Sequence, residues 1–357
     1  MNTGDMLLNM LDIYSPSGKE DKIAKLLQEY MVELDFENPI IDDKLNVISV
    51  NGNEKPSIFL CGHEDTVPGK LPVKIDGNIA YGRGAVDAKS SLLALILGAK
   101  KAMDRGYKHK FLISAASGEE SDSKGINNIL SNYDKYDYAI FGEPGGSENI
   151  TAGYKGRILV KVNARTETHH ASSSWMEKNA IDSLIDLWLS IRNKYGNNKD
   201  FNSITAGITK FNGGEYDNMT PENASMFIDL RYPKSISEEM LVDELKLSMK
   251  NSLSGDYSYN IENRTYPYIS DLKSPLVKAF MEAITVQGMK PKLIFKSGSG
   301  DMNTLGHQWK IPAITYGPGD TKMSHTQNEF VDLRDIEKCI NVIADAMIYM
   351  GNSGAIK

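Results

Sequence analysis

The stretch Phe59–Lys70, FLCGHEDTVPGK, begins as an apolar run and then places His63, Glu64 and Asp65 ahead of a proline turn. An unpaired carboxylate in an apolar interior is costly, so such a cluster persists only where salt bridges, solvent or a metal ion compensates for its burial. The apolar run predicts a buried strand. The polar residues that follow it predict a functional site at the strand's end.

Further segments resemble this stretch. Four short runs have the composition of strands and meet Gly, Pro or an acid soon afterwards, at 56–62, 110–117, 136–144 and 311–319. Segments of helical period occupy 17–34 and 87–103. This alternation predicts an α/β fold, a mixed and mainly parallel sheet flanked by helices.

Between residues 158 and 265 the pattern changes to that of a smaller α+β domain. Strand patterns at 158–166, 225–233 and 257–266 accompany a helical pattern at 179–196. Helix and strand patterns at 274–288 and 311–319 then resume the earlier alternation. We therefore predict a catalytic domain of residues 1–157 and 266–357, interrupted by a lid or dimerisation domain of residues 158–265.

Composition excludes several classes of function. The net charge of −7, without any basic cluster interleaved with aromatics, predicts no binding to nucleic acid. No apolar run approaches the roughly 20 residues of a membrane span, and no leader is recognised, so a cytoplasmic protein is expected. Two cysteines, Cys61 and Cys339, are too few for a disulfide framework or a thiolate metal site.

Titratable residues collect where the predicted strands end, which is where ligands bind in open parallel sheets. Taken alone, Asp87 is as readily a helix N-cap, and the pair Glu119 and Glu120 a solvated turn. Together the residues provide the mixed imidazole and carboxylate donors that two divalent ions can share. The set comprises His63, Asp65, Asp87, Glu119, Glu120, Glu143 and His325.

Five motifs carry a resemblance to a known family. They are GHEDTVP (62–68), YGRGAVDAKSSLLA (81–94), ASGEES (116–121), FGEP (141–144) and YGPGDTKMSHTQNE (316–329). In this order they resemble the motifs of the co-catalytic zinc aminoacylase and carboxypeptidase family, which includes acetylornithine deacetylase and succinyl-diaminopimelate desuccinylase. The resemblance spans nearly the whole chain. It implies hydrolysis of a linear amide bond with two divalent metal ions, Zn²⁺ or alternatively Co²⁺.

The resemblance also implies a ligand set. His63 and Glu143 would hold one metal, Glu120 and His325 the other, and Asp87 would bridge the two.

Two further acids receive roles from the same motifs. Asp65 would accept a hydrogen bond from the other ring nitrogen of His63 and fix its tautomer. Glu119 would be the unligated base, taking a proton from the attacking water and passing it to the leaving nitrogen.

The inserted domain resembles the family's lid. In ETHHASSS (167–174) the match favours His170 over His169 as a histidine that a second subunit supplies, so a homodimer is expected. The family's upstream glycine is replaced near Arg165 and Thr166, which leaves the register between the two histidines open.

Other motifs imply substrate contacts. DNMTPENASMFIDLRYP (217–233) places Asn218 and Arg231 near the substrate, whose carboxylate Arg231 could bind. The ordinary alternative is that Arg231 pairs with Asp229. In GSGDMN (298–303), Gly298 could admit a ligand to the backbone, and Asp301 could receive a lysine ammonium or cap a helix.

Within the family, GYKGR (153–157), GSGDMN and YGPGD resemble hydrolases that release lysine or ornithine from the C-terminal glutamate of a small acidic amino-group carrier protein. Lys155 and Arg157 are expected to form a basic rim for that carrier. The alternatives are a small-molecule deacylase, such as acetylornithine deacetylase or succinyl-diaminopimelate desuccinylase, or a dipeptidase. A non-catalytic relative is disfavoured because all five ligands and Glu119 are present.

Overall fold

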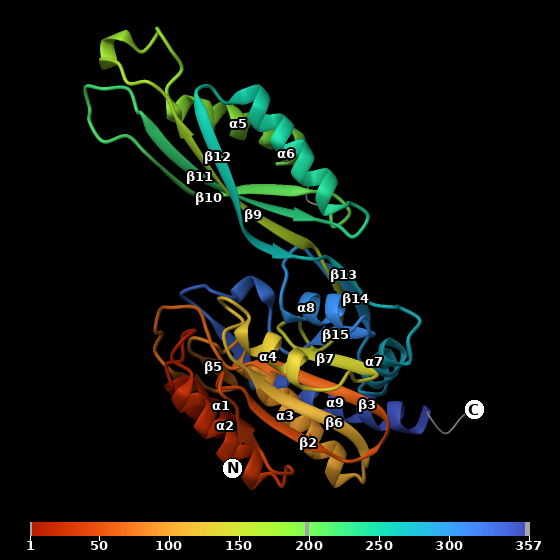
Figure 1. The fold of residues 1–357 in the computed structure, drawn as a ribbon. Coiled ribbons are helices and arrows are strands. Elements are labelled where there is room, and N and C mark those ends of the chain that lie inside the picture. Colours follow the sequence, from red (N-terminus) through yellow and green to blue (C-terminus); the bar gives the residue numbers. More distant parts are fainter. Residues whose placement is uncertain (1, 197–199, 354–357) are drawn as a thin grey trace. The chain divides into compact units, whose positions relative to one another are not determined.

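The computed structural model describes residues 2–196 and 200–353 (Figure 1). The chain divides into two compact units. The first contains the chain up to residue 153, residues 270–295 and the chain from residue 300 onward, and the second contains residues 154–269 and 296–299. The sequence places these boundaries at residues 158 and 265, and the second unit also contains the short segment 296–299.

The first unit is built on a mixed sheet with parallel strands at its centre, which confirms the predicted α/β class. The central order is β6-β3-β7-β15, and each neighbouring pair is parallel. These strands are β3 (Glu54–His63), β6 (His109–Ala116), β7 (Tyr138–Gly142) and β15 (Ala313–Tyr316). Because all four run the same way, their carboxyl ends meet along one edge of the sheet.

Antiparallel strands extend this sheet on both sides. Beyond β6 lie β2 (Val47–Asn51) and β1 (Ile40–Ile41). Beyond β15 lies β8 (Asn149–Tyr154), with which β14 (Lys292–Lys296) also pairs. A separate small sheet joins β16 (Phe330–Asp332), β5 (Ile79–Tyr81) and β4 (Lys74–Asp76).

Helices cover both faces of the central sheet, as the alternation of side chains along β3 shows. Ile58 and Leu60 point into the large core, whereas Phe59 points to the other face and contacts Trp309, with ring centroids 5.4 Å apart. The large core is closed by α1 (Thr3–Asp12), α2 (Asp21–Glu33), α3 (Lys89–Asp104), α7 (Pro275–Val286) and α9 (Leu333–Ser353). The opposite face carries α4 (Lys124–Asn132) and α8 (Asp301–Gln308) (Figure 1).

Two glycines let α3 approach the ends of the central strands closely. A Cβ at Gly62, just before His63, would lie 3.2 Å from the backbone of Leu92. A Cβ at Gly142, the last residue of β7, would lie 2.8 Å from Leu95. The N-terminus of α3 therefore lies directly against the strand ends at which the polar residues collect.

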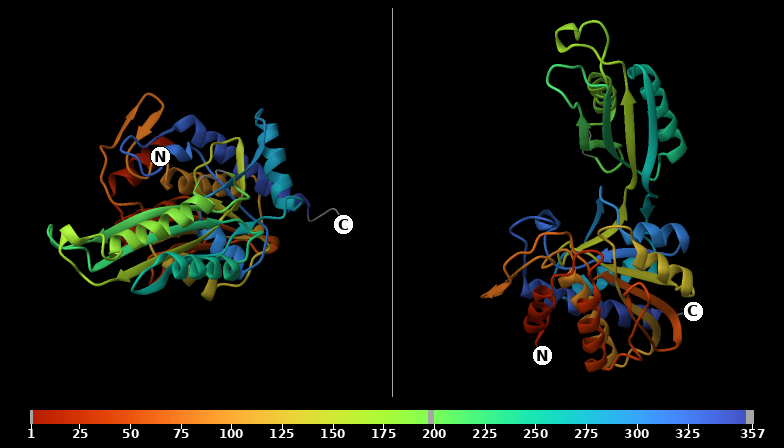
Figure 2. Two further views of the ribbon diagram at one scale, coloured as in Figure 1. Left: turned by 90° about the horizontal axis from the view of Figure 1, so that it is seen from above. Right: turned by 60° about the vertical axis from the view of Figure 1, so that its left-hand side comes forward.

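The second unit is an antiparallel sheet covered on one face by two helices (Figure 2). The strand order is β10-β11-β9-β12. Its elements are β9 (Gly156–Arg165), the short turn η1 (Ala171–Ser173), α5 (Ala180–Tyr195), β10 (Thr205–Gly213), β11 (Asn223–Tyr232), α6 (Glu238–Ser252), β12 (Asp256–Thr265) and β13 (Tyr268–Ile269). Burial alternates along β9, where Ile158, Val160 and Val162 enter the core with α5 and α6. Sequence patterns predict β9, α5, β11 and β12, and the structure adds β10 and α6.

Two sequence expectations have direct answers. Both cysteines, Cys61 and Cys339, are buried and unpaired. Among the described residues, no helix is long and apolar enough to cross a bilayer.

Candidate metal centre and active site

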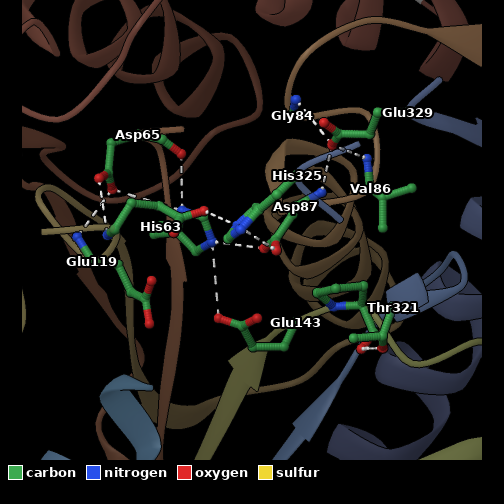
Figure 3. A network of polar contacts seen from close by, with 12 residues as sticks. His63, Asp65, Gly84, Val86, Asp87, Glu119, Glu143, Thr321, His325 and Glu329 are labelled. Carbon is green, nitrogen blue, oxygen red and sulfur yellow. Dashed lines mark hydrogen bonds and ion pairs between the residues drawn. The ribbon is translucent and has the colours of Figure 1, made fainter. Parts of the chain in front are cut away.

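The predicted ligands come together at the carboxyl ends of the central strands (Figure 3). His63 is the last residue of β3, and Glu143 follows β7. Glu120 lies in the turn after β6, and His325 lies in the loop after β15, beyond the short turn η2 (Thr321–Met323). Asp87 lies two residues before α3, and the Asp87–Ala88 peptide bond is cis.

Asp87 lies between the two histidines. Its Oδ1 is 3.3 Å from His63 Nε2, and its Oδ2 is 3.3 Å from His325 Nε2. Glu143 Oε1 lies 3.9 Å from His63 Nε2, and Glu120 Oε1 lies 2.8 Å from His325 Nε2. The N-cap of α3 is Ala88 and not Asp87, so the helix-cap alternative does not describe Asp87.

This arrangement fits two divalent cations that share one carboxylate. The donor atoms of His63, Asp87 and Glu143 lie within 4.8 Å of one another, and so do those of Asp87, Glu120 and His325. Imidazole and carboxylate suit Zn²⁺ and similar ions, and paired ions in such sites lie about 3.5 to 4 Å apart. The backbone φ of His325 is 62°, in the left-handed region that residues with side chains adopt uncommonly.

Without metal, the histidines neutralise the acids. Hydrogen bonds to Asp87 and Glu120 raise the pKa of His325 to about 10. Burial alone would raise the pKa of Asp87, but its bonds with His325 and His63 outweigh burial and hold that pKa well below its usual range. Burial would lower the pKa of His63, but its interactions with Asp65 and Asp87 outweigh burial and hold that pKa well above its usual range. Both histidines therefore favour the protonated form before a cation binds.

Cation binding should consequently release protons. Each imidazole must lose its proton to coordinate a metal, so loading both ions at pH 7 should release about two protons, and metal affinity should rise with pH up to about pH 10. Calorimetry in buffers of different ionisation enthalpy measures this number. Binding without proton release at pH 7 would show that His63 and His325 are neutral in the metal-free protein.

Asp65 organises the site differently from the prediction. The hydrogen-bond partner of His63 Nδ1 is the backbone carbonyl of Asp65 at 2.9 Å, whereas the Asp65 carboxylate lies 3.6 Å from that nitrogen. The carboxylate instead accepts the backbone N–H groups of Glu119 and Glu120, each at 3.1 Å, and the hydroxyl of Ser17 at 2.6 Å. Asp65 thus fixes the turn that carries both glutamates.

Ser17 accounts for a difference in α2. The helical pattern in the sequence begins at Ser17, but α2 begins at Asp21. The Ser17 hydroxyl is used at the site, where it donates to Asp65.

Glu119 is the acid of this site that forms no ion pair with His63 or His325. Its donor atoms lie within 4.8 Å of those of His63 and Glu120, yet among the described ion pairs none involves Glu119. A Cβ at Gly300, the N-cap of α8, would lie 3.0 Å from Glu119 Oε1, so that backbone borders the carboxylate. Burial raises the pKa of Glu119 well above its usual range. A half-buried carboxylate with a raised pKa is suited to accepting a proton.

Glu64, the remaining acid of the opening stretch, is not placed as a ligand. Its side chain is fully buried, and burial raises its pKa well above the usual range. The nearby Lys89 is also buried, and its ammonium donates to the carbonyls of Met10 and Ile13. Burial lowers the pKa of Lys89 to about 7, against the opposing effect of Glu64. Of the two acids after His63, therefore, one fixes a turn and the other is enclosed in the core.

Glu329 is a functional residue that sequence analysis missed. Its Oε1 accepts the backbone N–H groups of Gly84, Val86 and Asp87 at 2.9 to 3.0 Å, and its Oε2 accepts Arg83 Nη1 at 2.8 Å (Figure 3). One fully buried carboxylate thus fixes the loop that presents Asp87. The signal was present, since Glu329 closes the motif YGPGDTKMSHTQNE.

Glu329→Ala should destabilise the metal-free protein by about 3 to 5 kcal/mol, because it leaves buried Arg83 and three backbone donors without a partner. Urea unfolding of the metal-free protein measures this change. Asp243→Ala is the control, since its pair with Lys246 is exposed and worth at most about 1 kcal/mol. Equal effects of the two substitutions would contradict a special role for Glu329.

The second unit contains four of the predicted substrate residues. His170 pairs with Met219 through a backbone bridge, and its Nδ1 contacts the Ser172 hydroxyl at 2.8 Å. The carbonyl of Asn218 accepts the N–H of Ala171 at 2.8 Å, so the segments carrying His170 and Asn218 lie side by side.

Arg231 pairs with Asp229, as the ordinary alternative predicts. Its Nε lies 2.6 Å from Asp229 Oδ1, and its Nη1 donates to the hydroxyl of Ser299 at 3.0 Å, beside Gly298. Arg157 pairs with the same carboxylate at 2.8 Å. Two guanidinium groups thus share one acid, which leaves a net positive charge on this cluster.

Asp301 is the first residue of α8 and not its cap. The cap of α8 is Gly300, whose N–H donates to Asn303 Oδ1. Asp301 is buried in the first unit, its Oδ1 has no hydrogen-bond partner among the described residues, and burial raises its pKa to about 7.

The prediction that Lys155 forms part of a basic rim is wrong. This side chain is fully buried, and its ammonium donates to the carbonyls of Asp200 and Ser203 at 3.0 and 2.6 Å. A lysine held in this way cannot contact a carrier protein. The aliphatic stem of lysine lets it be buried wherever carbonyls can receive its head group, and the sequence does not reveal where that happens.

Comparison with known proteins places the chain in a family. The sequence profile of Peptidase family M20/M25/M40 matches residues 59–349, which include all five predicted ligands. The chain belongs to the M20 family. A curated putative [LysW]-lysine/[LysW]-ornithine hydrolase of Pyrococcus furiosus is 34% identical to this M20 protein over 98% of this chain and 97% of that protein. The [LysW]-lysine/[LysW]-ornithine hydrolase of Sulfurisphaera tokodaii is also 34% identical, over 93% and 91%.

Solved structures share the fold of this M20 protein. A tripeptidase from Staphylococcus aureus superposes with a TM-score of 0.85 over 98% of both chains at 20% identity. The M20 metallo-carboxypeptidase Sso-CP2 of Sulfolobus solfataricus gives 0.80 over 99% and 100% at 19% identity. A Bacillus subtilis relative with a TM-score of 0.74 is described as a dinuclear metal-binding peptidase of the M20 family. At these identities the likeness concerns the fold alone.

Proposed function

We propose that this M20 protein is a metal-dependent hydrolase that releases lysine or ornithine from the C-terminal glutamate of an amino-group carrier protein. The observation that carries the proposal is Asp87, whose two carboxylate oxygens each face one histidine. Near full-length similarity to [LysW]-lysine/[LysW]-ornithine hydrolases supports the substrate. Such a biosynthetic role is consistent with a cytoplasmic enzyme.

The ligand assignment follows the two donor groups. His63 and Glu143 would hold one cation, Glu120 and His325 the other, with Asp87 between them. Zn²⁺ suits this mixture of imidazole and carboxylate, and Co²⁺ suits it nearly as well. When bound, such a pair of cations activates water and polarises the amide carbonyl of the substrate.

Glu119 performs the proton transfers. Its carboxylate takes a proton from the attacking water and later delivers it to the departing amino group of lysine or ornithine. Asp65 holds the backbone of Glu119 in place, which keeps this base beside the reacting atoms.

Residues of the second unit complete the site in this proposal. His170 would donate to the oxygen on which negative charge develops, an interaction typically worth about 10² to 10³ in rate. Arg231 and Asn218 would bind the carboxylate of the released amino acid, with Gly298 and Asp301 near its side chain. The spare positive charge shared by Arg157 and Arg231 suits an anionic group.

His170 would be supplied by a second subunit of a homodimer. If so, mixing inactive Glu119→Gln with inactive His170→Ala should restore part of the activity, because one site of each mixed dimer is intact. Lysine release measures recovery after subunit exchange has been verified. Persistent inactivity would count against the contribution in trans, and a His169→Ala mixture that recovers in its place would reassign the lid histidine.

A substrate panel tests the function. We expect catalytic efficiency to be highest for carrier protein carrying lysine or ornithine at its terminal glutamate, and much lower for acetylornithine, succinyl-diaminopimelate and dipeptides. The Glu119→Gln variant is the control that distinguishes this enzyme from a contaminant. Equal efficiency on acetylornithine and on the carrier conjugate would favour the alternative of a small-molecule deacylase.

A further inference from the structure

We propose that the segment of residues 10–17 braces the metal centre, and that Lys89 is the positioning residue through which this brace holds the carboxylate of Asp87. The inference rests on the metal centre of the proposed function and adds to it a part of the chain outside the ligand set. Lys89 is the first residue of α3, two residues after Asp87. Its side chain is only 1% exposed. Lysine is almost never fully buried unless its ammonium has partners, so the position of those partners is informative.

The ammonium of Lys89 ends on the brace. It donates to the backbone carbonyls of Met10 at 2.8 Å and Ile13 at 2.7 Å. Met10 belongs to the last turn of α1, and Ile13 is the residue that follows this helix. The last carbonyls of a helix have no partners within it, and the helix dipole favours a positive charge there. Lys89 therefore fastens the C-terminal end of α1 to the start of α3.

The stem of Lys89 packs against the loop that presents Asp87. Lys89 N donates to the carbonyl of Gly84 at 3.0 Å, which closes this loop. The φ of Gly84 is +88°, and a Cβ there would lie 3.0 Å from both Lys89 Cδ and Thr66 Cγ2. Glu329 holds the backbone N–H groups of the same loop. Two separate anchors, Lys89 and Glu329, therefore fix the position of the bridging carboxylate.

The brace also holds the end of β3, where His63 lies. Ser15 Oγ donates to the carbonyl of Glu64 at 3.0 Å. In return, Thr66 N donates to the carbonyl of Ser15 at 3.0 Å. The brace thus contacts both the segment that carries His63 and, through the ammonium, the loop before α3.

A brace in this place fixes the distance between two ligands of one cation. His63 Nε2 lies 3.3 Å from Asp87 Oδ1. Bonds to a metal depart from their preferred lengths by only about 0.2 Å in a good site, so a small displacement of either segment weakens binding. Without the ammonium of Lys89, the loop keeps its bonds with Glu329 but loses its connection to α1. We therefore expect weaker metal binding in a protein that still folds.

Metal titration of Lys89→Met tests the brace, because methionine keeps most of the stem and removes the ammonium. The Zn²⁺ affinity of the centre should fall about 10- to 100-fold, the range found when a residue that supports a metal ligand is lost. The visible absorption of the Co²⁺-loaded protein should also change, since it depends on the geometry of the ligands.

Lys155→Met is the matched control. Lys155 is equally buried, and its ammonium also donates to two backbone carbonyls, those of Asp200 and Ser203 in the second unit. Its substitution should lower the stability of the protein in a similar way. It should leave the Zn²⁺ affinity and the Co²⁺ absorption unchanged.

Ser15→Ala keeps the test decisive if Lys89→Met does not fold. It removes one hydroxyl of the brace, the one that donates to Glu64, and should weaken Zn²⁺ binding at least about twofold. Its matched control is Ser49→Ala, which removes a buried hydroxyl that donates to the carbonyl of Glu37. Metal binding by this control should equal that of the wild type.

The outcomes separate this inference from the proposed function. A wild-type protein that does not bind two ions would overturn the proposed function and the brace together. If the wild type binds two ions and folded Lys89→Met, or else Ser15→Ala, binds them with unchanged affinity, the brace alone is overturned. Equal losses of affinity in Lys89→Met and Lys155→Met would overturn it too, because lost stability would then explain both.

Discussion

Glu119→Gln should still bind both ions of the metal centre and yet release lysine or ornithine at least about 10²-fold more slowly than the wild type. The amide keeps the size of the carboxylate but cannot accept the proton of the attacking water. Metal should stay because the carboxylate of Glu119 pairs with neither histidine, whereas Glu120 lies 2.8 Å from His325 Nε2. Single-turnover rates and metal analysis of the same sample give both numbers.

Glu120→Gln is the matched control for this substitution. It alters the neighbouring glutamate and should lose one ion together with activity, because the second donor group loses a carboxylate. If metal analysis instead found one ion in Glu119→Gln and two in Glu120→Gln, the roles of the two glutamates would be exchanged.

Asp87→Ala should lose most of both ions and nearly all activity. Each oxygen of this carboxylate faces a different histidine at 3.3 Å, so one truncation removes a ligand from both cations. Loss of a residue that only supports a metal ligand already weakens metal affinity or activity by about 10- to 100-fold, and here a ligand of two ions is removed. Equilibrium dialysis with metal analysis measures both losses.

Asp104→Ala, at the C-terminal end of α3, is the control for Asp87→Ala. Its carboxylate is exposed and, among the described residues, pairs with Lys100 alone, so metal content and activity should be unchanged. An Asp87→Ala protein that kept two ions and substantial turnover would show that Asp87 does not bridge them.

The sequence predicts the sheet well, and it also predicts which polar side chains meet at the edge of that sheet, because both depend on local patterns. Buried parallel strands are continuous apolar runs, and residues such as His63 and Glu143 follow those runs directly. The order of the motifs then identifies the family. Asp87 is recognised as a candidate ligand only through its family motif, because its immediate sequence fits a helix cap equally well.

What the sequence does not predict is set by contacts between distant segments. Glu329 accepts three backbone N–H groups of a loop that lies more than 240 residues away in the sequence. No periodicity in the sequence connects the two. Lysine is usually a surface residue, yet the ammonium of Lys155 donates to backbone carbonyls of another segment. Asp65 keeps its place at the site, but its carboxylate supports the turn after β6 while its carbonyl orients His63.

The order of the candidate ligands along the chain has a consequence for how the protein assembles during its translation. The group of His63, Asp87 and Glu143 is complete once the first strands have left the ribosome, because chains emerge and fold from the N-terminus. The second group needs His325, which is translated only after the whole second unit. A nascent chain can therefore offer one cation three of its ligands early, while its partner ion must wait until β15 has joined the sheet. Release of a chain shortened before His325 would leave an enzyme with half a metal centre.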